Sequence, residues 1–554
     1  MSKVKLRRFY IITFDYIIIG AGSAGCALAY RLTEDKKNTV ALIEYGGSDF
    51  GPFIQMPSAL SYPMNMNRYN WGYKTEPEEG LNNRRLSCPR GKVLGGSSSI
   101  NGMIYVRGNA EDFNFWEESG ARGWGFASVL PYFKRQENSH EGDASWRGKN
   151  GPLHITRGTR ENPLNDVLVS AAQEAGFLAT EDYNGFQQEG FGPADRTIWK
   201  GSRWSAAKAY LKPSIQTKKL KIFKNALVDK INFSDRKAIG VTFSQNGRSK
   251  KILARREVIC SAGSINSPLI LQRSGIGPSN LLKKHNIDVL LDNQNVGENL
   301  QDHLEVYFQV KCKKPITLYK YNNFFSKGII GLNWLLFKKG IGASNHFETL
   351  GFLRSNNKVK YPDIQFHLLP IAINYDGSSA VNDHGFQLHT GPMRSKSRGW
   401  VKITSSNPKS NPKIKFNYMK HPDDWIEFRN CIKITRKILN QQSFKDFYEE
   451  EIQPGKQKIS NDDLDNFIKE EAESAYHPCG TIKMGDKNDP SSVVDPNCKV
   501  IGIENLRVVD SSIFPRITNG NTNAPSIMVG EKASDIILGK MPLPRENLEP
   551  FKHT

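Results

Sequence analysis

The stretch Phe14–Leu32 reads FDYIIIGAGSAGCALAYRL and decides the fold of the chain. Its apolar run, Asp15–Ile19, is typical of a parallel strand that is buried on both faces. Glycines follow in the pattern GxGxxG, at Gly20, Gly22 and Gly25, before apolar residues at helical spacing. The stretch therefore predicts a strand, a tight turn and a helix, which together begin a Rossmann-like α/β unit.

Each glycine of this motif has a physical task. Gly20 permits the tight turn, Gly22 lets the backbone approach a pyrophosphate, and Gly25 lets helix and strand pack closely. The expected second strand, Val40–Ile43, ends at Glu44, whose carboxylate can accept hydrogen bonds from a ribose. These features predict a dinucleotide site at the helix N-terminus, which attracts phosphates. The motif does not distinguish FAD from NAD, and a glycine-rich turn of another α/β protein is the alternative.

Length and charge limit the remaining possibilities. The chain has 554 residues, too many for one small core, so two domains are expected. Its 76 basic and 56 acidic residues give a formal net charge of +20. This charge indicates either attraction to an anionic membrane or a polyanion, or simply a lysine-rich composition. Since no short stretch is strongly basic, the second interpretation is favoured and no nucleic-acid binding is expected.

The start of the chain, Met1–Ile19, is basic and then apolar, which superficially resembles a secretion signal. Asp15 interrupts the apolar stretch and a glycine-rich turn follows, so a strand is expected there. Seven scattered cysteines form no CxxC pair, and no apolar run reaches the roughly 20 residues of a membrane span. We therefore expect a cytoplasmic protein with reduced thiols and no metal site, with at most peripheral contact at the inner face of the membrane.

A second glycine-rich segment, Cys88–Asn109, reads CPRGKVLGGSSSINGMIYVRGN. Its glycines bring backbone close to a ligand, and its apolar residues argue against a flexible surface loop. RGKVLGGSSSING resembles the signature of the glucose-methanol-choline (GMC) oxidoreductases, which are FAD enzymes that oxidise alcohols. The resemblance implies that Arg90–Gly96 and Asn101–Ile104 run along the flavin and its pyrophosphate.

Further stretches are similar to this family, in the family's order. They are EVICSAGSINSPLILQRSGIGP (Glu257–Pro278), VGENLQDH (Val296–His303), NLRVVDSSIFP (Asn505–Pro515) and NGNTNAPSIMVGEKASDII (Asn519–Ile537). The resemblance thus covers nearly the whole chain. The cofactor-binding residues that it implies are Gly20, Gly22, Ser23, Ala24, Gly25, Glu44, Trp71, Arg90, Val93, Gly95, Gly96, Asn101, Gly102, Met103, Ile104, Val228, Ala262, Gly263, Asp510, Asn523, Ala524 and Pro525.

One histidine acquires a role through the resemblance. The stretch Ala475–Gly485, AYHPCGTIKMG, contains His477, and a lone histidine is more often structural than catalytic. In the family, the histidine of HPxGTxxMG faces the flavin and takes the proton of the substrate hydroxyl. The resemblance implies that His477 is this base, that Asn521 orients the hydroxyl, and that hydride passes to flavin N5. A neutral imidazole suits proton abstraction at pH 7.

The expected substrate is a primary alcohol, with choline as the best guess. GASNHFET (Gly342–Thr349) and QLHTGPMRSKSRGWVKI (Gln387–Ile403) look closer to choline-oxidising members of the family than to glucose oxidases. A quaternary ammonium needs aromatic faces and a carboxylate. Glu305 matches an acidic residue that contacts the ammonium in those relatives, and an exposed strand charge is the alternative. Tyr476 and His303 are the other expected substrate residues.

Cofactor attachment and electron acceptor are less constrained. Some choline oxidases attach FAD through a histidine at the position of Ile100, so non-covalent FAD is expected here. The acceptor is a quinone or another molecule, O2 included, and the oligomeric state is left open. Alternative functions are oxidation of another aliphatic or aromatic alcohol, fatty-acid photodecarboxylation on the same fold, and a non-catalytic flavoprotein.

The expected architecture is α/β, with a Rossmann-like FAD-binding domain interleaved with a substrate-binding domain built on an antiparallel sheet with flanking helices. The FAD-binding domain is assigned to 13–153, 203–305 and 470–540, and the substrate-binding domain to 154–202 and 306–469. The family's N-terminal and C-terminal parts are expected at about 14–305 and 396–535. Alternating patterns in Tyr361–Ile373 and Trp400–Tyr418 predict the antiparallel sheet, and Asp423–Leu439 predicts a helix.

Overall fold

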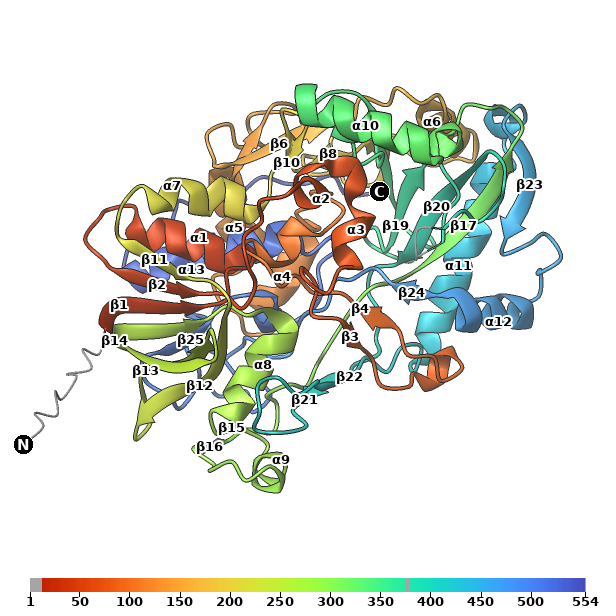
Figure 1. Cartoon of the computed structure of the whole chain (residues 1–554). Coiled ribbons are helices and arrows are strands. Elements are labelled where there is room, and N and C mark those ends of the chain that lie inside the picture. Colours follow the sequence, from red (N-terminus) through yellow and green to blue (C-terminus); the bar gives the residue numbers. More distant parts are fainter. Residues whose placement is uncertain (1–11, 375–377, 554) are drawn as a thin grey trace, which may run out of the picture.

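The computed structural model describes residues 12–374 and 378–553. The basic start of the chain, residues 1–11, where the sequence superficially resembles a secretion signal, lies outside these ranges. The apolar stretch after it forms strand β1, Ile12–Ile19, as the sequence predicts. Figure 1 shows a sheet toward each side of the molecule, with helices packed around both.

The first sheet is the Rossmann-like part of the chain. Its parallel strands run in the order β11 (Leu220–Phe223), β2 (Val40–Ile43), β1, β14 (Arg248–Cys260) and β25 (Leu506–Val508). The first half of β14 also pairs with the antiparallel hairpin of β12 (Ala226–Ser234) and β13 (Lys237–Gln245). Strands from both ends of the sequence therefore meet in one sheet.

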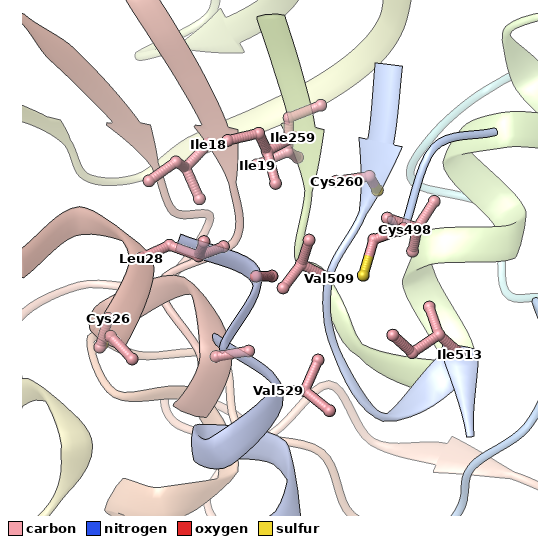
Figure 2. Packing of buried hydrophobic residues seen from close by; sticks show 14 of the residues in the cluster. Ile18, Ile19, Cys26, Leu28, Ile259, Cys260, Cys498, Val509, Ile513 and Val529 are labelled. Atoms are coloured by element: carbon pink, nitrogen blue, oxygen red, sulfur yellow. The ribbon is translucent and has the colours of Figure 1, made fainter. Parts of the chain in front are cut away.

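Helices from both ends of the sequence cover this sheet. Helix α1 (Ser23–Thr33) packs against α13 (Asn523–Leu538), which in turn contacts α5 (Phe126–Gln136). Figure 2 shows the core between them, where Ile18 and Ile19 of β1 lie near Leu28 and Val529. Successive residues of β1 are both buried because the sheet is covered on both faces. Each such side chain stabilises the fold by about 1.5–3 kcal/mol.

The second sheet is antiparallel, which confirms the pattern read in Tyr361–Ile373. Its strands run in the order β23 (Tyr448–Gln453), β17 (Leu304–Cys312), β20 (Gly385–Pro392), β19 (Ile364–Leu369), β18 (Thr349–Leu353) and β7 (Gly190–Pro193), with β24 (Glu473–Ser474) beside β17. The helix predicted at Asp423–Leu439 is α11 (Pro422–Leu439), which packs against β20 and α12 (Asn461–Glu471).

The stretch Trp400–Tyr418 departs from its prediction. It forms a separate hairpin of β21 (Trp400–Lys402) and β22 (Lys413–Lys415), outside the antiparallel sheet. The backbone N–H of Val401 donates to Gly297 O at 2.7 Å, so this strand is bonded to a distant loop. Alternation of polar and apolar residues shows that a strand has two unlike faces, but it does not identify the strand or loop with which that strand pairs.

The remaining helices and strands are mostly short. They are α2 (Pro52–Gln55), α3 (Ser61–Met64), β3 (Tyr73–Lys74), β4 (Ser87–Cys88), α4 (Ala110–Glu118), β5 (Glu137–Ser139), β6 (Leu153–Arg157), α6 (Leu164–Glu174), β8 (Asp195–Arg196), β9 (Ile198–Trp199), β10 (Ser202–Arg203), α7 (Lys212–Ile215), α8 (Gly263–Arg273), β15 (Ile276–Gly277), α9 (Ser279–Lys284), β16 (Leu291–Asp292) and α10 (Phe324–Phe337). All seven cysteines are buried and unpaired. In the described part of the chain, every helix is too short or too polar to cross a membrane.

Candidate active site

A cavity is lined jointly by residues of the Rossmann-like part and of the antiparallel sheet. On the Rossmann side it includes these predicted cofactor residues: Gly20, Gly22, Ser23, Ala24, Glu44, Trp71, Arg90, Gly96, Asn101, Gly102, Met103, Ile104, Val228, Ala262, Gly263, Asp510 and Asn523. Of the same set, Gly25, Val93, Gly95, Ala524 and Pro525 do not line it. The predicted substrate residues Glu305 and Tyr476 and the predicted catalytic residues His477 and Asn521 also border the cavity.

The glycines of the first turn shape one wall. A Cβ atom on Gly25 would stand 2.0 Å from Gly20 O, and one on Gly96 would stand 2.7 Å from Gly22 Cα. These close approaches require glycine, because a Cβ atom would overlap backbone atoms that are themselves closely packed. Gly22 differs, since its nearest such neighbour, Ser261 O, is 3.9 Å away on the cavity side. Among the described residues no side chain caps the N-terminus of α1, so its N–H dipoles are open to an anion in the cavity.

Glu44 lies directly after β2, where the sequence predicts the ribose-binding acid. Its carboxylate accepts hydrogen bonds from the backbone N–H groups of Ala21, at 3.0 Å, and Gly46, at 2.7 Å. Burial raises the pKa of Glu44 to about 7, against the effect of these bonds. The side chain thus joins the first turn to the end of the second strand while it borders the cavity.

The backbone around His477 is fixed by buried polar groups. Tyr476 has a left-handed φ of 65°, and its carbonyl accepts a hydrogen bond from Arg90 Nη2 at 2.7 Å. The N–H of His477 donates to Asp302 Oδ1 at 2.7 Å, and Tyr418 donates its hydroxyl to the other oxygen at 2.6 Å. An unusual backbone conformation held by several bonds is typical of a positioned functional residue.

A chain of hydrogen bonds assigns the protons of His477. His303 Nε2 lies 2.9 Å from Met393 O and must donate, because a carbonyl oxygen only accepts. His303 Nδ1 therefore carries a lone pair and accepts from His477 Nδ1 at 3.1 Å. The remaining nitrogen, His477 Nε2, then carries the lone pair that accepts a hydrogen bond from Asn521 Nδ2 at 3.0 Å. Asn521 is oriented for this donation because its Oδ1 accepts from Gln365 at 3.2 Å.

Burial keeps these imidazoles neutral. The pKa of His477 lies well below its ordinary value, because burial and then the neighbouring His303, His367 and Arg90 disfavour a positive charge. Burial also lowers the pKa of His303 to about 4. At pH 7 His477 therefore presents an unprotonated Nε2 beside the amide of Asn521, within the cavity.

The structure changes the place predicted for His303. The sequence prediction puts it beside the substrate, but its side chain does not line the cavity and is fully buried behind His477. Its ring nitrogens are bonded to His477 and to Met393, and neither atom borders the cavity.

Glu305 lies on β17, at the wall that the antiparallel sheet contributes. Its Oε1 is 3.2 Å from His389 Nδ1, and His389 Nε2 is 2.8 Å from the side-chain amide of Gln387. Since Gln387 Oε1 accepts from the N–H of Ile373 at 2.9 Å, its NH2 group faces His389. His389 is then neutral, with Nδ1–H donated to Glu305. Within the described residues, no lysine or arginine forms an ion pair with Glu305.

Aromatic rings pack against His389, the hydrogen-bond partner of this carboxylate. Phe347 lies edge-on to His389, with ring centroids 5.3 Å apart, and Tyr307 lies 3.9 Å from the same ring. Both rings line the cavity and so present aromatic surface to a ligand there. Trp71 lines it too, but its ring stacks on Tyr73 with centroids 5.5 Å apart.

Sequence reasoning missed part of this wall. Tyr307, His367 and His389 line the cavity and were not predicted. The only signal for the histidines is a polar ring inside an apolar strand, in FHLL and QLHT. Such a signal does not say which buried face of the sheet borders a cavity.

Comparison with known proteins now adds to the geometry. Family models described as GMC oxidoreductase match residues 14–305 and 395–530. The chain belongs to this family, and it is an FAD-dependent oxidoreductase that acts on CH–OH groups. An alcohol is its substrate, and a further molecule accepts the electrons.

The similarity extends over nearly the full length of particular relatives. The chain is 60% identical to the oxygen-dependent choline dehydrogenase of Brucella anthropi, over 97% of this chain and 98% of the relative. It is 56% identical to the protein of the same name from Rhizobium meliloti, with the same coverage.

Solved structures share the fold at lower identity. A formate oxidase of Aspergillus oryzae superposes with a TM-score of 0.89 at 27% identity, covering 95% of this chain and 98% of that one. Pyridoxine 4-oxidase from Mesorbium loti gives 0.86 at 29% identity, covering 95% and 99%.

Proposed function

We propose that the protein oxidises choline to betaine aldehyde, with His477 as the base and FAD bound non-covalently. The observation that carries the proposal is the pairing, in one cavity, of a neutral His477 with Glu305, a carboxylate that contacts His389 and forms no ion pair with a lysine or arginine of the described chain. A primary alcohol that carries a fixed positive charge satisfies both ends of such a cavity. The full-length similarity to choline dehydrogenases supports this choice.

The Rossmann-side wall fits FAD. The close glycine contacts leave backbone at the cavity surface, and the open N-terminus of α1 suits a pyrophosphate. Glu44 is the group for the ribose, and Arg90 and 101–104 border the space for the rest of the cofactor. When bound, FAD supplies the acceptor for the hydride of the alcohol carbon. Ile100 lines the cavity and offers no nucleophile for a covalent link.

His477 Nε2 takes the hydroxyl proton in this proposal. Its lone pair points to the amide of Asn521 in the structure, so the alcohol oxygen has a base and a hydrogen-bond donor at one place. Loss of the proton makes the alcohol carbon a much better hydride donor. His303 and Met393 keep Nδ1–H on the far side of the ring, so the base cannot change tautomer without breaking two bonds.

Glu305 holds the ammonium end of the substrate. His389 donates to one carboxylate oxygen and orients the group without neutralising it. Phe347, Tyr307 and Tyr476 supply aromatic surface around the same region, which suits a quaternary ammonium. We assign His389 and Gln387 as positioning residues for Glu305.

A different primary alcohol is the second candidate, because the His477–Asn521 pair acts on any hydroxyl of suitable size. Photodecarboxylation and a non-catalytic role are disfavoured by this positioned base. For the electron acceptor, a quinone and O2 both fit the proposal.

We keep 13–153, 203–305 and 470–540 as the FAD-binding domain and 154–202 with 306–469 as the substrate-binding domain.

Steady-state turnover of two alcohols of equal shape tests the proposal. Choline and its neutral isostere 3,3-dimethyl-1-butanol differ only in charge at the position that Glu305 would hold. We expect a kcat/KM for choline at least about tenfold higher, which corresponds to about 1.4 kcal/mol of differential binding. Equal values would favour the second candidate, oxidation of a neutral alcohol.

A further inference from the structure

Helix α10, Phe324–Phe337, exposes an unusual amount of apolar surface. Phe324, Phe325 and Ile329 are 88%, 81% and 69% exposed. Figure 1 shows the helix at the outer edge of the molecule, with one side turned away from the other elements. Monomeric proteins rarely expose such a contiguous apolar patch unless it binds something. The other exposed apolar residues of the helix are Leu332, Leu335, Leu336 and Phe337.

The periodicity of the helix separates two apolar faces. Ser326, Ile330 and Trp334 follow one another every four residues on the inner face, and Trp334 is buried with its Nε1 donating to Gly201 O at 2.6 Å. Residues at 324, 325, 328, 329, 332, 335 and 336 lie on the opposite face. The helix is therefore anchored to the protein on one side and apolar on the other, without being part of a core.

The charged residues of α10 and of its flanking segments are all basic. The sequence from Leu318 to Ile341 contains four lysines and no aspartate or glutamate. Lys327 is exposed near one end of the helix, and Lys338 follows its last residue, with Nζ 3.5 Å from the centre of the Trp334 ring. On a neighbouring segment, burial lowers the pKa of Lys208, the charge of Asp49 raises it and those of Lys212 and Lys338 lower it further, so these groups are within electrostatic reach of one another.

We propose that the outer face of α10 inserts into the surface of an anionic lipid bilayer, with the flanking lysines at the headgroups. Fourteen residues span about 21 Å at 1.5 Å per residue, which is short of the roughly 30 Å hydrocarbon core. The helix therefore lies in the plane of the interface. A second copy of the chain would bring lysine-rich edges together, which like charges oppose, whereas anionic headgroups complement them.

This surface is closely linked to the cavity. The chain leaves α10 through the turn Ile341–Ala343 and reaches Phe347, a lining residue, ten residues after Phe337. Asn345 donates to Gly102 O at 2.7 Å and so attaches this linker to the other cavity wall. Binding at α10 would place the catalytic cavity a short chain segment from the lipid phase.

Vesicle flotation tests the proposal. We expect the full-length protein to float with vesicles that contain phosphatidylglycerol and to bind less to pure phosphatidylcholine. High salt should weaken the binding without abolishing it, whereas attraction by net charge alone would be fully reversed by salt. The triple variant Phe325→Ser, Leu332→Ser, Leu336→Ser should lose at least about tenfold in affinity for these vesicles.

A matched variant controls for the loss of exposed apolar surface as such. Ile426→Ser, Ile459→Ser, Met541→Ser changes residues that are 52%, 71% and 86% exposed elsewhere, and it should bind as the wild type does. Equal binding by both triple variants and the wild type would overturn the proposal. So would a wild-type dimer that the α10 variant converts to a monomer, because the face would then be a contact between copies.

A label at the helix gives a second readout that does not depend on activity. Because all seven cysteines are buried, Leu332→Cys provides one accessible thiol for an environment-sensitive fluorophore. The emission should shift to the blue when phosphatidylglycerol vesicles are added. The same label at Ile459→Cys should not respond, and an equal response at both positions would contradict insertion of α10.

Discussion

The nitrogen that meets the substrate is selected by bonds on the far side of the imidazole. Met393 O fixes the proton of His303, and His303 fixes that of His477, so the lone pair is on Nε2. The tautomer that turns the Nε2 lone pair of His477 toward the cavity thus depends on His303, a histidine that does not line the cavity. We treat His303 as a positioning residue that acts through His477.

Two substitutions at His303 separate positioning from packing. His303→Asn keeps an oxygen acceptor near the place of Nδ1, whereas His303→Leu removes the acceptor. We expect the Leu variant to lose about 100-fold in kcat, in the range that general-base catalysis contributes, with little change in KM. The Asn variant should recover most of this loss. Steady-state kinetics at equal FAD content measure kcat and KM of both variants. Equal kcat values for the two variants would contradict the proposal that His303 fixes the tautomer of His477.

Glu305→Gln tests the charge at the other end of the substrate. A carboxylate about 5 Å from an ammonium contributes about 3 kcal/mol at an effective dielectric constant of 20. The variant should therefore lose about 150-fold in kcat/KM for choline. With 3,3-dimethyl-1-butanol it should change by less than about threefold. A parallel loss with both alcohols would mean that Glu305 supports the pocket's shape and not the cation.

At the scale of elements, the strand–turn–helix unit has two kinds of glycine. Gly25→Ala places a Cβ 2.0 Å from Gly20 O, and relieving such overpacking costs about 1–3 kcal/mol or more. Gly22→Ala meets nothing closer than 3.9 Å, and its φ of −78° suits alanine. We expect the first variant to lower the melting temperature of the FAD-free protein.

The second variant provides the matched control. Gly22→Ala should leave the FAD-free protein at least as stable as the wild type, since alanine restricts the unfolded chain. Its methyl group enters the cavity, so the purified protein should contain less FAD, measured by the flavin-to-protein absorbance ratio. If Gly22→Ala retained full FAD, the pyrophosphate would not approach this backbone as proposed.

Predictability differs among elements for physical reasons. The pattern around Gly20 identifies β1, α1 and β2, because strand, turn and helix are each specified by neighbours in sequence. Trp400–Tyr418 forms antiparallel strands as predicted, but its place outside the larger sheet does not follow from the sequence, because Gly297, to which Val401 is bonded, is remote in sequence. The same limit applies to the site. A motif predicts His477, whereas the roles of Gln387 and His389 depend on how two strands align.

At the scale of the whole molecule, buried acids and buried histidines give opposite pH effects. Burial raises the pKa of Glu78 to about 7, although it accepts bonds from the N–H groups of Phe416 and Tyr418. Its contribution to stability is present below the unfolded pKa of 4.5 and is lost as pH rises through about 7. His303 and His367, with pKa values lowered to about 4 and about 3, destabilise the fold as pH falls below 6.5.

A difference between variants isolates the acid from the histidines. Glu78→Gln removes one acceptor and the titration together, so it should be less stable than the wild type at pH 5. The difference in the free energy of unfolding between the two proteins should narrow by up to about 3 kcal/mol toward pH 8, because ionisation of Glu78 destabilises the wild type. Melting temperatures of both proteins across this range measure it. The neighbouring exposed Glu79→Gln should show no such narrowing, and a constant Glu78 gap would contradict the raised pKa.

In the proposed function, one cavity holds FAD, a neutral base and a carboxylate for an ammonium alcohol. The most direct test is the flavin spectrum of the purified protein under anaerobic conditions, before and after choline is added. Bleaching of the flavin band by choline, at lower concentration than by 3,3-dimethyl-1-butanol, is the predicted result. A yellow protein that choline leaves unchanged, while a neutral primary alcohol bleaches it, would contradict the account of Glu305 and of the substrate.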